Sequence, residues 1–413
     1  EMCIRDRANT GEKHTIDGVE MEFVYVLDTE APVEIMIWLP QLKAFCTAED
    51  MTHNMHNLQT LRGAKVRNGL LWSKAVDTAI ERYGDQVEVS FSTHHWPTWG
   101  NERIVNYWEA QRDMYRYLHD QTLHLANRGL TPDEIAEEMK LPASLASQFN
   151  CRGYYGTLSH NVKAQYDLYF GWFNGNPAHL NPLPPSELGA KYVEAIGGAD
   201  KVLEVAKASY AKGEYRWVAT LLDNLVFAEP DNMEARQLLA DTYTQLGYQA
   251  ESGPWRNFYL TGARDLFKKD VPYTSQLIND GVLAQMDMGT LLDYCAIQLN
   301  GEKAAGKKAV ININFTDTKE KVMLMLNNGV LNHRLDSQDE KADLTLEIEK
   351  MNFVKLFFGR TDLQTLLKTD KVKTTGNTQA MDVICSAYEP ADPNFKIVLP
   401  VSYTHLTLPT IRL

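Results

Sequence analysis

The chain has 413 residues, of which 44% are hydrophobic and 23% are charged, which excludes a wholly disordered or collagen-like protein. Asp and Glu (54) outnumber Lys and Arg (41), and the resulting formal charge of −13 argues against a broad nucleic-acid-binding surface. No apolar run reaches the ~20 residues of a transmembrane segment. The five cysteines are widely spaced and form no CxxC pair, which argues against a cysteine-bound zinc site.

The two ends of the chain differ in character from the rest. Residues 1–7 (EMCIRDR) lack the apolar core of a signal peptide, and residues 401–413 (VSYTHLTLPTIRL) follow an abrupt change after Pro400. Both strings resemble translated sequencing-adapter sequence, so we exclude them from the fold prediction. We expect the protein to run from about Ala8 to Pro400 and to lack its true N-terminal part.

Residues 8–112 alternate predicted strands with a helix. Strands are expected at residues 21–27 (MEFVYVL), in the apolar segment 34–40 (EIMIWLP) and from residue 87 onward, where apolar and polar side chains alternate. A helix is expected between them, because apolar residues before Gly84 recur at helical spacing, and Gly84 is expected to end it. This order predicts an α/β layered unit.

Residues 113–270 are predicted to be helical throughout. Thr131, Pro132 and Glu134 have the spacing of a capping box with proline at the first helical position. Residues 201–250 have the rhythm of tetratricopeptide-type helical hairpins. Only about one and a half repeats are visible, too few for an independent solenoid, so we predict a helical domain that uses the hairpins for packing or self-association.

Residues 275–400 are predicted to form an α+β domain. Three strand-like runs cover residues 309–317, 321–335 and 342–350, and Asn-Asn-Gly at 327–329 predicts a hairpin turn. A helix is expected over residues 351–367 and a last strand over 395–399. Six apolar side chains there suit either an apolar tunnel or, on the residues alone, an ordinary core: Met323, Met325, Phe353, Leu356, Phe357 and Phe358.

Acidic and histidine side chains follow three of the predicted N-terminal strands. Glu30 follows the first strand, Glu49 follows the next apolar segment, and the pair His94 and His95 ends the strand that begins at residue 87. Strand ends often carry functional groups, and two carboxylates with an imidazole suit a two-metal site. On spacing alone, solvated loop acids and a packed histidine are the more common interpretation.

The segment 51–68 (MTHNMHNLQTLRGAKVRN) leads into the predicted helix and is dense in polar groups. Asn57, Arg62 and Arg67 stand near a helix start, where backbone N–H groups and arginine side chains bind anions well. A solvated helix start is the alternative. His53 and His56 are three residues apart without the third ligand of an HExxH pattern, which excludes a zincin.

These blocks resemble the linear alkylsulfatases, SDS-hydrolase-type enzymes of the metallo-β-lactamase superfamily. The resemblance lies in the order and spacing of DTEAPVE, CTAED with THNMHNLQTLRGAKVR, STHHWPTWGN, and CRGYYGTLSHNVKAQYDLYFGWFNGNPAHLNPLPP at 151–185, and it covers nearly all of residues 8–400. It implies the C-terminal half of an αββα metallo-β-lactamase domain at 8–112, an all-helical dimerisation domain at 113–270 and a sterol-carrier-like (SCP2) domain at 275–400.

The resemblance also implies roles for named side chains. Glu30, Glu49 and His94 would be ligands of a centre of two Zn²⁺ ions, with Glu49 bridging the ions and His95 as the alternative histidine. Two such ions activate a water molecule for attack near neutral pH.

Other positions would serve the substrate. Asn57 and Arg62, with Arg67 as a weaker addition, would bind the sulfate group. His160 would reach the pocket from the helical domain as a catalytic group, or it would be a packed interdomain histidine.

The implied activity is zinc-dependent hydrolysis of alkyl sulfate esters to an alcohol and inorganic sulfate, by a homodimer without nucleic acid or a transmembrane segment. The superfamily motif HxHxDH is absent, so we expect this chain alone neither to bind two zinc ions nor to hydrolyse sulfate esters. The alternatives are another hydrolase of the superfamily, acting on a phosphoester or lactone, and a non-catalytic lipid-binding or dimerisation protein carried by residues 113–400. Arg62 with Asn57 favours a tetrahedral oxyanion over a lactone.

Overall fold

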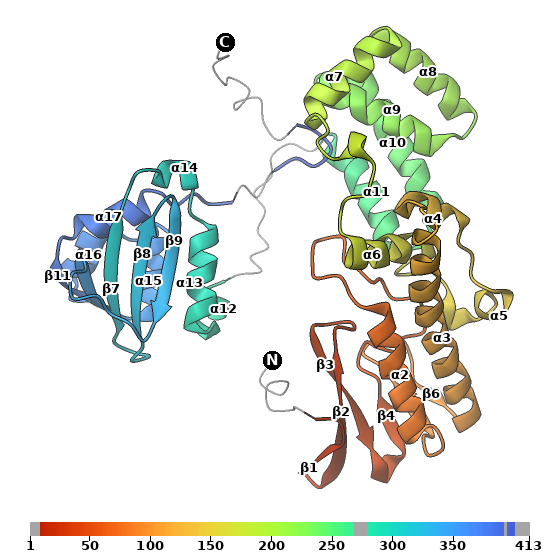
Figure 1. Cartoon of the computed structure of the whole chain (residues 1–413), viewed down its shortest axis with the longest axis horizontal. Helices are drawn as coiled ribbons and strands as arrows, with labels where there is room; N and C mark the ends of the chain where they lie inside the picture. The colour runs from red at the N-terminus through yellow and green to blue at the C-terminus, as the bar shows by residue number, and fades with distance from the viewer. Residues whose placement is uncertain (1–8, 268–278, 392–394, 401–413) are drawn as a thin grey trace. The chain divides into compact units, whose positions relative to one another are not determined.

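The computed structural model describes residues 9–267, 279–391 and 395–400, so both adapter-like ends lie outside the described residues. The described chain forms two compact units (Figure 1). One contains residues 9–267 together with 396–400, and the other contains residues 279–391 together with 395. The first two predicted regions therefore share one unit, and helix α3 (Asn101–Ala126) runs across the expected boundary at residue 112.

A six-stranded mixed sheet opens the first unit. Its strands are hydrogen-bonded in chain order: β1 (Glu12–Ile16), β2 (Val19–Leu27), β3 (Val33–Leu39), β4 (Ala44–Cys46), β5 (Val89–Phe91) and β6 (Thr98–Trp99). Only the β4–β5 pair is parallel within this sheet, and β3 is antiparallel to both of its neighbours. As a result, β2, β4 and β5 all end at the same edge of the sheet.

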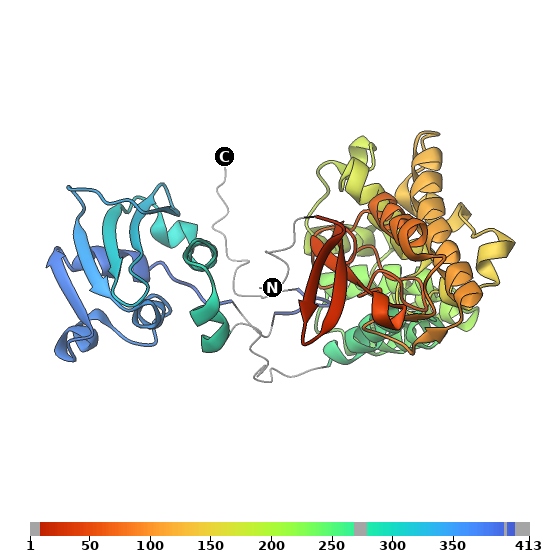
Figure 2. The ribbon, with the colours of Figure 1, turned by 90° about the horizontal axis from the view of Figure 1, so that it is seen from below.

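Helices cover one face of this sheet. Helix α2 (Gly69–Tyr83) and helix α3 lie along it (Figures 1 and 2), and their buried Trp72 and Trp108 join Val24, Met36 and Phe45 in one core. The opposite face carries half-buried apolar side chains of β3, as expected for alternation along a strand. The second sheet of a layered metallo-β-lactamase domain is not among the described residues of this unit.

Helices make up the rest of the first unit: η1 (Pro40–Leu42), α4 (Pro132–Glu138), α5 (Ala143–Ala146), η2 (Phe149–Cys151), α6 (Leu158–Phe170), η3 (Pro177–His179), α7 (Pro185–Ile196), α8 (Ala199–Ala211), α9 (Tyr215–Ala228), α10 (Met233–Gln249) and α11 (Gly253–Asp265). The predicted capping box is confirmed, because Thr131 and Glu134 exchange hydrogen bonds at the start of α4. The strand predicted over 395–399 is wrong. Val398 and Leu399 instead pack against the core of helices α7 to α11. Their apolar side chains are covered by these helices, and the segment pairs with no strand of the described residues.

The second unit has helices around a five-stranded sheet of order β11-β10-β7-β8-β9. The elements are α12 (Asp280–Gln285), α13 (Met288–Ile297), α14 (Gly301–Ala304), β7 (Ala309–Phe315), β8 (Lys321–Asn327), β9 (Val330–Leu335), β10 (Leu344–Ile348), α15 (Lys350–Phe357), α16 (Leu363–Lys368), β11 (Val372–Gly376) and α17 (Gln379–Cys385). The Asn-Asn-Gly hairpin is confirmed, with Asn328 and Gly329 both in the left-handed region. The single helix predicted over 351–367 is wrong, because the chain turns at Gly359 (φ 65°) between α15 and α16.

Of the six side chains considered for an apolar tunnel, Phe353, Leu356, Phe357 and Phe358 contribute to this unit's core, whereas Met323 and Met325 do not belong to it. Phe353 and Phe357 are fully buried, and the Phe353 ring packs edge-on against Phe315. The sterol-carrier-like assignment stays a prediction.

Candidate functional site

Three loops at one edge of the first sheet carry the candidate metal ligands. Glu30 lies after β2, Glu49 after β4 and His94 after β5, and these strands end at the same edge. Each loop contains a non-glycine residue in the left-handed region: Asp28 (φ 53°), Ala48 (φ 49°) and His95 (φ 69°). Such backbone conformations cost roughly 1–3 kcal/mol each and cluster at functional sites, where packing enforces them.

The structure brings two of the three predicted metal ligands together and adds a histidine. Ligand atoms of Glu30, Glu49 and His56 lie within 4.8 Å of one another. The Glu49 Oε1 atom is 2.6 Å from His94 Nε2 and 3.8 Å from His56 Nε2. The neighbouring imidazoles, His56 first and then His94, hold the pKa of Glu49 at about 2 although burial opposes this. His95, the alternative ligand, points its Nε2 to the Asn54 side chain instead, 2.8 Å away.

Two further carboxyl groups lie buried next to this cluster. Asp50 is fully buried beside the Thr29 hydroxyl, the Glu30 backbone N–H and the Glu34 carboxyl, and neither of its carboxylate oxygens forms a hydrogen bond of good geometry with the described residues. One oxygen of Glu34 is also unpartnered, while the other accepts a hydrogen bond from the Glu49 backbone N–H. Burial raises the pKa of both groups; repulsion from Asp50 adds to this at Glu34, and repulsion from Glu30 adds to it at Asp50. The carboxylates of Glu30 and Glu49 with the imidazole of His56 are a ligand set that zinc accepts.

A cavity of about 390 Å³ opens beside the cluster. It is lined by Glu49, Thr52, Asn54, His56, His94, His95, Tyr154 and Tyr155. The Tyr155 ring lies 4.8 Å from the His56 ring, and the Tyr155 carbonyl accepts a hydrogen bond from Ser252 at the start of α11. Sequence reasoning assigned no role to His56 or to the two tyrosines. The dense polar segment around His56 and the glycine-flanked tyrosine pair were the available signals.

The predicted sulfate-binding residues separate into two groups. Asn57 and Arg67 are buried together, with Arg67 Nη1 donating to Asn57 Oδ1 at 2.5 Å, and Arg67 also forms an ion pair with Glu30. Arg62 is exposed in the loop before α2 and does not line the cavity. The structure thus joins Asn57 and Arg67 to the metal-ligand cluster but does not join Arg62 to it.

His160, the predicted catalytic group, is held between two parts of the first unit. Its Nε2 lies 2.6 Å from the Gln59 carbonyl, to which it donates, and its Nδ1 accepts a hydrogen bond from Trp255 Nε1 at 3.2 Å. Burial lowers the pKa of this imidazole, which favours the neutral ring that these contacts require. Both ring nitrogens are engaged, as expected for a packed histidine, and the catalytic role stays a prediction.

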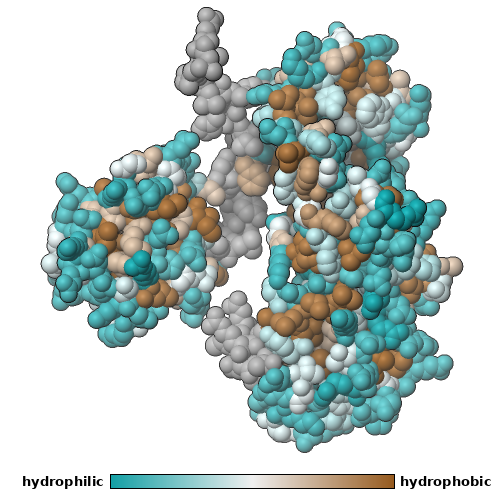
Figure 3. Space-filling view, in the orientation of Figure 1, coloured by the Kyte–Doolittle hydropathy of each residue, from teal (hydrophilic) through white to brown (hydrophobic). Residues whose placement is uncertain are grey.

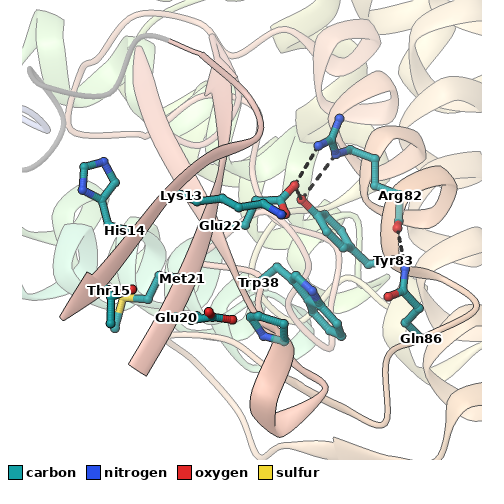
Figure 4. A pocket seen from close by; sticks show the side chains of 11 residues that line it. Lys13, His14, Thr15, Glu20, Met21, Glu22, Trp38, Arg82, Tyr83 and Gln86 are labelled. Atoms are coloured by element: carbon teal, nitrogen blue, oxygen red, sulfur yellow. Dashed lines mark hydrogen bonds and ion pairs between the residues drawn. The ribbon is translucent and has the colours of Figure 1, made fainter. Parts of the chain in front are cut away.

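A second cavity, of about 490 Å³, lies near the start of β2 (Figure 4). Three of its side chains interact through one carboxylate: Arg82 donates to Glu22 at 2.7 Å, and the Tyr83 hydroxyl donates to the same group. Trp38 and Tyr83 stack with ring centroids 5.2 Å apart.

Known proteins match this chain over most of its length. A family model described as alkyl sulfatase dimerisation matches residues 131–269, and one described as alkyl sulfatase C-terminal matches residues 276–400. A linear primary-alkylsulfatase from a Pseudomonas species is 46% identical over 393 residues, covering 95% of this chain. Another linear primary-alkylsulfatase, from a second Pseudomonas strain, is 32% identical, and the match covers 70% of its length. The chain belongs to the alkylsulfatase family.

A solved structure agrees with this membership. The stereoselective inverting sec-alkylsulfatase Pisa1 from Pseudomonas matches with a TM-score of 0.92 at 41% identity, over 95% of this chain and 62% of that chain. The chain spans 58% of the length of the first relative above. In the described part of the chain, no helix is both long and apolar enough to cross a membrane.

Proposed function

We propose that this chain carries part of the active site for hydrolysis of alkyl sulfate esters to an alcohol and inorganic sulfate. The observation that supports it most is the convergence of Glu30, Glu49 and His56 within 4.8 Å beside a cavity. We propose that these residues, with His94 next to Glu49, hold zinc. The substrate class follows from relatives named as primary and secondary alkylsulfatases.

The chain's own residues would bind and orient the substrate. Zinc, when bound, supplies a Lewis acid that activates water near neutral pH. Glu49 is ionised at such pH and would stay available as a ligand, since its pKa is about 2. The Asn57 amide, held by Arg67, would face the sulfate group. Arg62 stays a prediction as a sulfate contact, because it is exposed and does not line the cavity.

An aromatic surface beside the cavity is proposed to hold the alkyl chain. Trp96 is 60% exposed and Phe149 48% exposed, and their rings lie 6.3 Å apart. Phe149 also contacts Tyr154, which lines the cavity, with centroids 5.5 Å apart. A sulfate group in the cavity would place an attached chain beside these rings. Each buried methylene group would contribute about 0.8 kcal/mol.

The helical part is proposed to form a homodimer, as the description of its family model suggests. Trp217 and Tyr192, each about half exposed, border an apolar groove of about 350 Å³ between α7 and α9. Figure 3 shows hydrophobic side chains gathered where these helices lie in Figure 1. Light scattering during gel filtration should give twice the chain mass for wild type and the chain mass for Trp217→Glu. A monomeric wild type would refute the dimer.

The activity is tested by restoring the length of the relatives. The chain is joined to the part of the Pseudomonas linear primary-alkylsulfatase that it does not match, and sulfate release from dodecyl sulfate is measured with and without Glu49→Gln. We expect zinc-dependent release that the substitution reduces by at least 100-fold. Preference for dodecyl phosphate would favour the phosphoester alternative, and no turnover of either ester by a folded, zinc-loaded chimera would favour the non-catalytic one.

The chain of 413 residues serves as the control for this chimera. It should release no sulfate, and it should hold fewer than two zinc ions because it lacks HxHxDH. Two equivalents of bound zinc on this chain would refute that expectation.

A further inference from the structure

Arg67 lies between the candidate metal ligands and the candidate sulfate-binding amide. Its Nε donates to the Glu30 carbonyl at 2.5 Å, and its Nη2 donates to the Glu30 carboxylate. Its Nη1 donates to the Asn57 carbonyl at 2.9 Å and to Asn57 Oδ1 at 2.5 Å. Its Nη1 also lies 3.3 Å from His56 Nδ1. An arginine has five N–H donors, so these contacts occupy most of its capacity. The side chain is 9% exposed.

The backbone of Arg67 is fixed on both sides. Its N–H donates to the Leu58 carbonyl at 2.8 Å, and its carbonyl accepts from Gln165 Nε2 at 2.9 Å. Gln165 is fully buried on α6, and its Oε1 accepts from the Gly69 N–H at 3.0 Å. The guanidinium therefore projects from a backbone segment clamped by a helix within the family's dimerisation region.

We infer that Arg67 is a positioning residue, which holds the Glu30 carboxylate and the Asn57 amide in place for the cation and the sulfate group. The inference rests on the proposed function for the identity of those two ligands. A buried guanidinium with most donors engaged has little left to offer a sulfate group. By Coulomb's law alone, a positive charge beside a cation site weakens cation binding. Removing Arg67 should therefore weaken zinc binding if the residue positions the ligands, and strengthen zinc binding if its effect is purely electrostatic.

Zinc titration calorimetry of the 413-residue chain separates the two roles. Arg67→Met should weaken zinc binding about tenfold or more, the size seen when an outer partner of a metal ligand is lost. Arg67→Lys should fall between Arg67→Met and wild type, because an ammonium group cannot hold Glu30 and Asn57 together. The control Arg82→Met removes another Arg–Glu ion pair, that with Glu22 in Figure 4, and should change the affinity less than twofold. Unchanged or tighter zinc binding by Arg67→Met would overturn the inference.

A metal-free crystal structure keeps this test separate from the proposed function. In Arg67→Met, or in Arg67→Lys should the former not fold, Glu30 and Asn57 should leave their present positions. If both side chains stay in place, the inference is overturned whatever the metal result. If wild type binds no zinc yet both side chains move in the variant, the proposed metal site fails while the positioning role stands.

Discussion

Gln165→Met tests whether helix α6 fixes the segment that leads into α2. Gln165 is fully buried and serves two backbone groups, accepting from Gly69 N–H at 3.0 Å and donating to the Arg67 carbonyl at 2.9 Å. Methionine has nearly the same volume, so the substitution removes the hydrogen bonds without opening a cavity. Each backbone group left without a partner costs about 1–3 kcal/mol. The expected loss of unfolding free energy is therefore about 2–6 kcal/mol.

Urea unfolding followed by tryptophan fluorescence measures this loss. The matched control is Gln237→Met on α10, because Gln237 is exposed and bonds only the Asp241 side chain among the described residues. The control should change the unfolding free energy by less than about 0.5 kcal/mol. If Gln165→Met is as mild as the control, the backbone of Arg67 and Gly69 does not depend on α6, and the reasoning is refuted.

Four further substitutions test other parts of the account. Phe149→Ala should weaken the binding of octyl sulfate, measured by calorimetry, severalfold and leave the binding of inorganic sulfate unchanged. Phe258→Ala, at a similarly exposed ring, should change neither. Equal effects of the two substitutions would contradict an alkyl-chain surface at Phe149. Burial raises the pKa of Glu22, but hydrogen bonds from Arg82 and Tyr83 outweigh it, so the pKa in the folded protein lies below 4.5. The ionised Glu22 should therefore stabilise the fold above pH 4.5, and this stabilisation should disappear as the pH falls through the folded pKa. Glu22→Gln should flatten that pH dependence in urea unfolding, and an unchanged slope would contradict it. Thr131→Ala should cost about 1 kcal/mol by removing the α4 cap, a prediction that fails if the urea midpoint does not move. Leu399→Ala should cost about 2–4 kcal/mol if the C-terminal segment is part of the helical core, and a neutral result in thermal unfolding would exclude that.

Local chemistry made much of the fold predictable. The capping box at Thr131 and the Asn-Asn-Gly turn each depend on a few adjacent residues, and both were found where the sequence predicts them. The strand predicted over residues 395–399 was wrong because five residues of strand-like composition do not show which part of the chain they pack against. Its apolar side chains pack on helices that lie more than 130 residues earlier in the chain.

The candidate site was predictable only in part. Glu30, Glu49 and His94 were placed at strand ends, and the strand order explains why these ends meet. His56 could not be found in this way, because its place depends on distant contacts. Its backbone carbonyl accepts from Asn161 on α6, 105 positions away, and its N–H donates to the Tyr115 hydroxyl on α3. Such long-range hydrogen bonds leave no periodic pattern in the sequence.

Anomalous diffraction at the zinc edge, on crystals of the chain soaked in zinc, tests the central claim most directly. We predict one peak about 2.0–2.2 Å from oxygens of Glu30 and Glu49 and from a nitrogen of His56 or His94. The same peak should be absent from crystals of Glu49→Gln. A zinc peak elsewhere, or one that persists at this position in Glu49→Gln, would contradict the assignment of this sheet edge as the metal site.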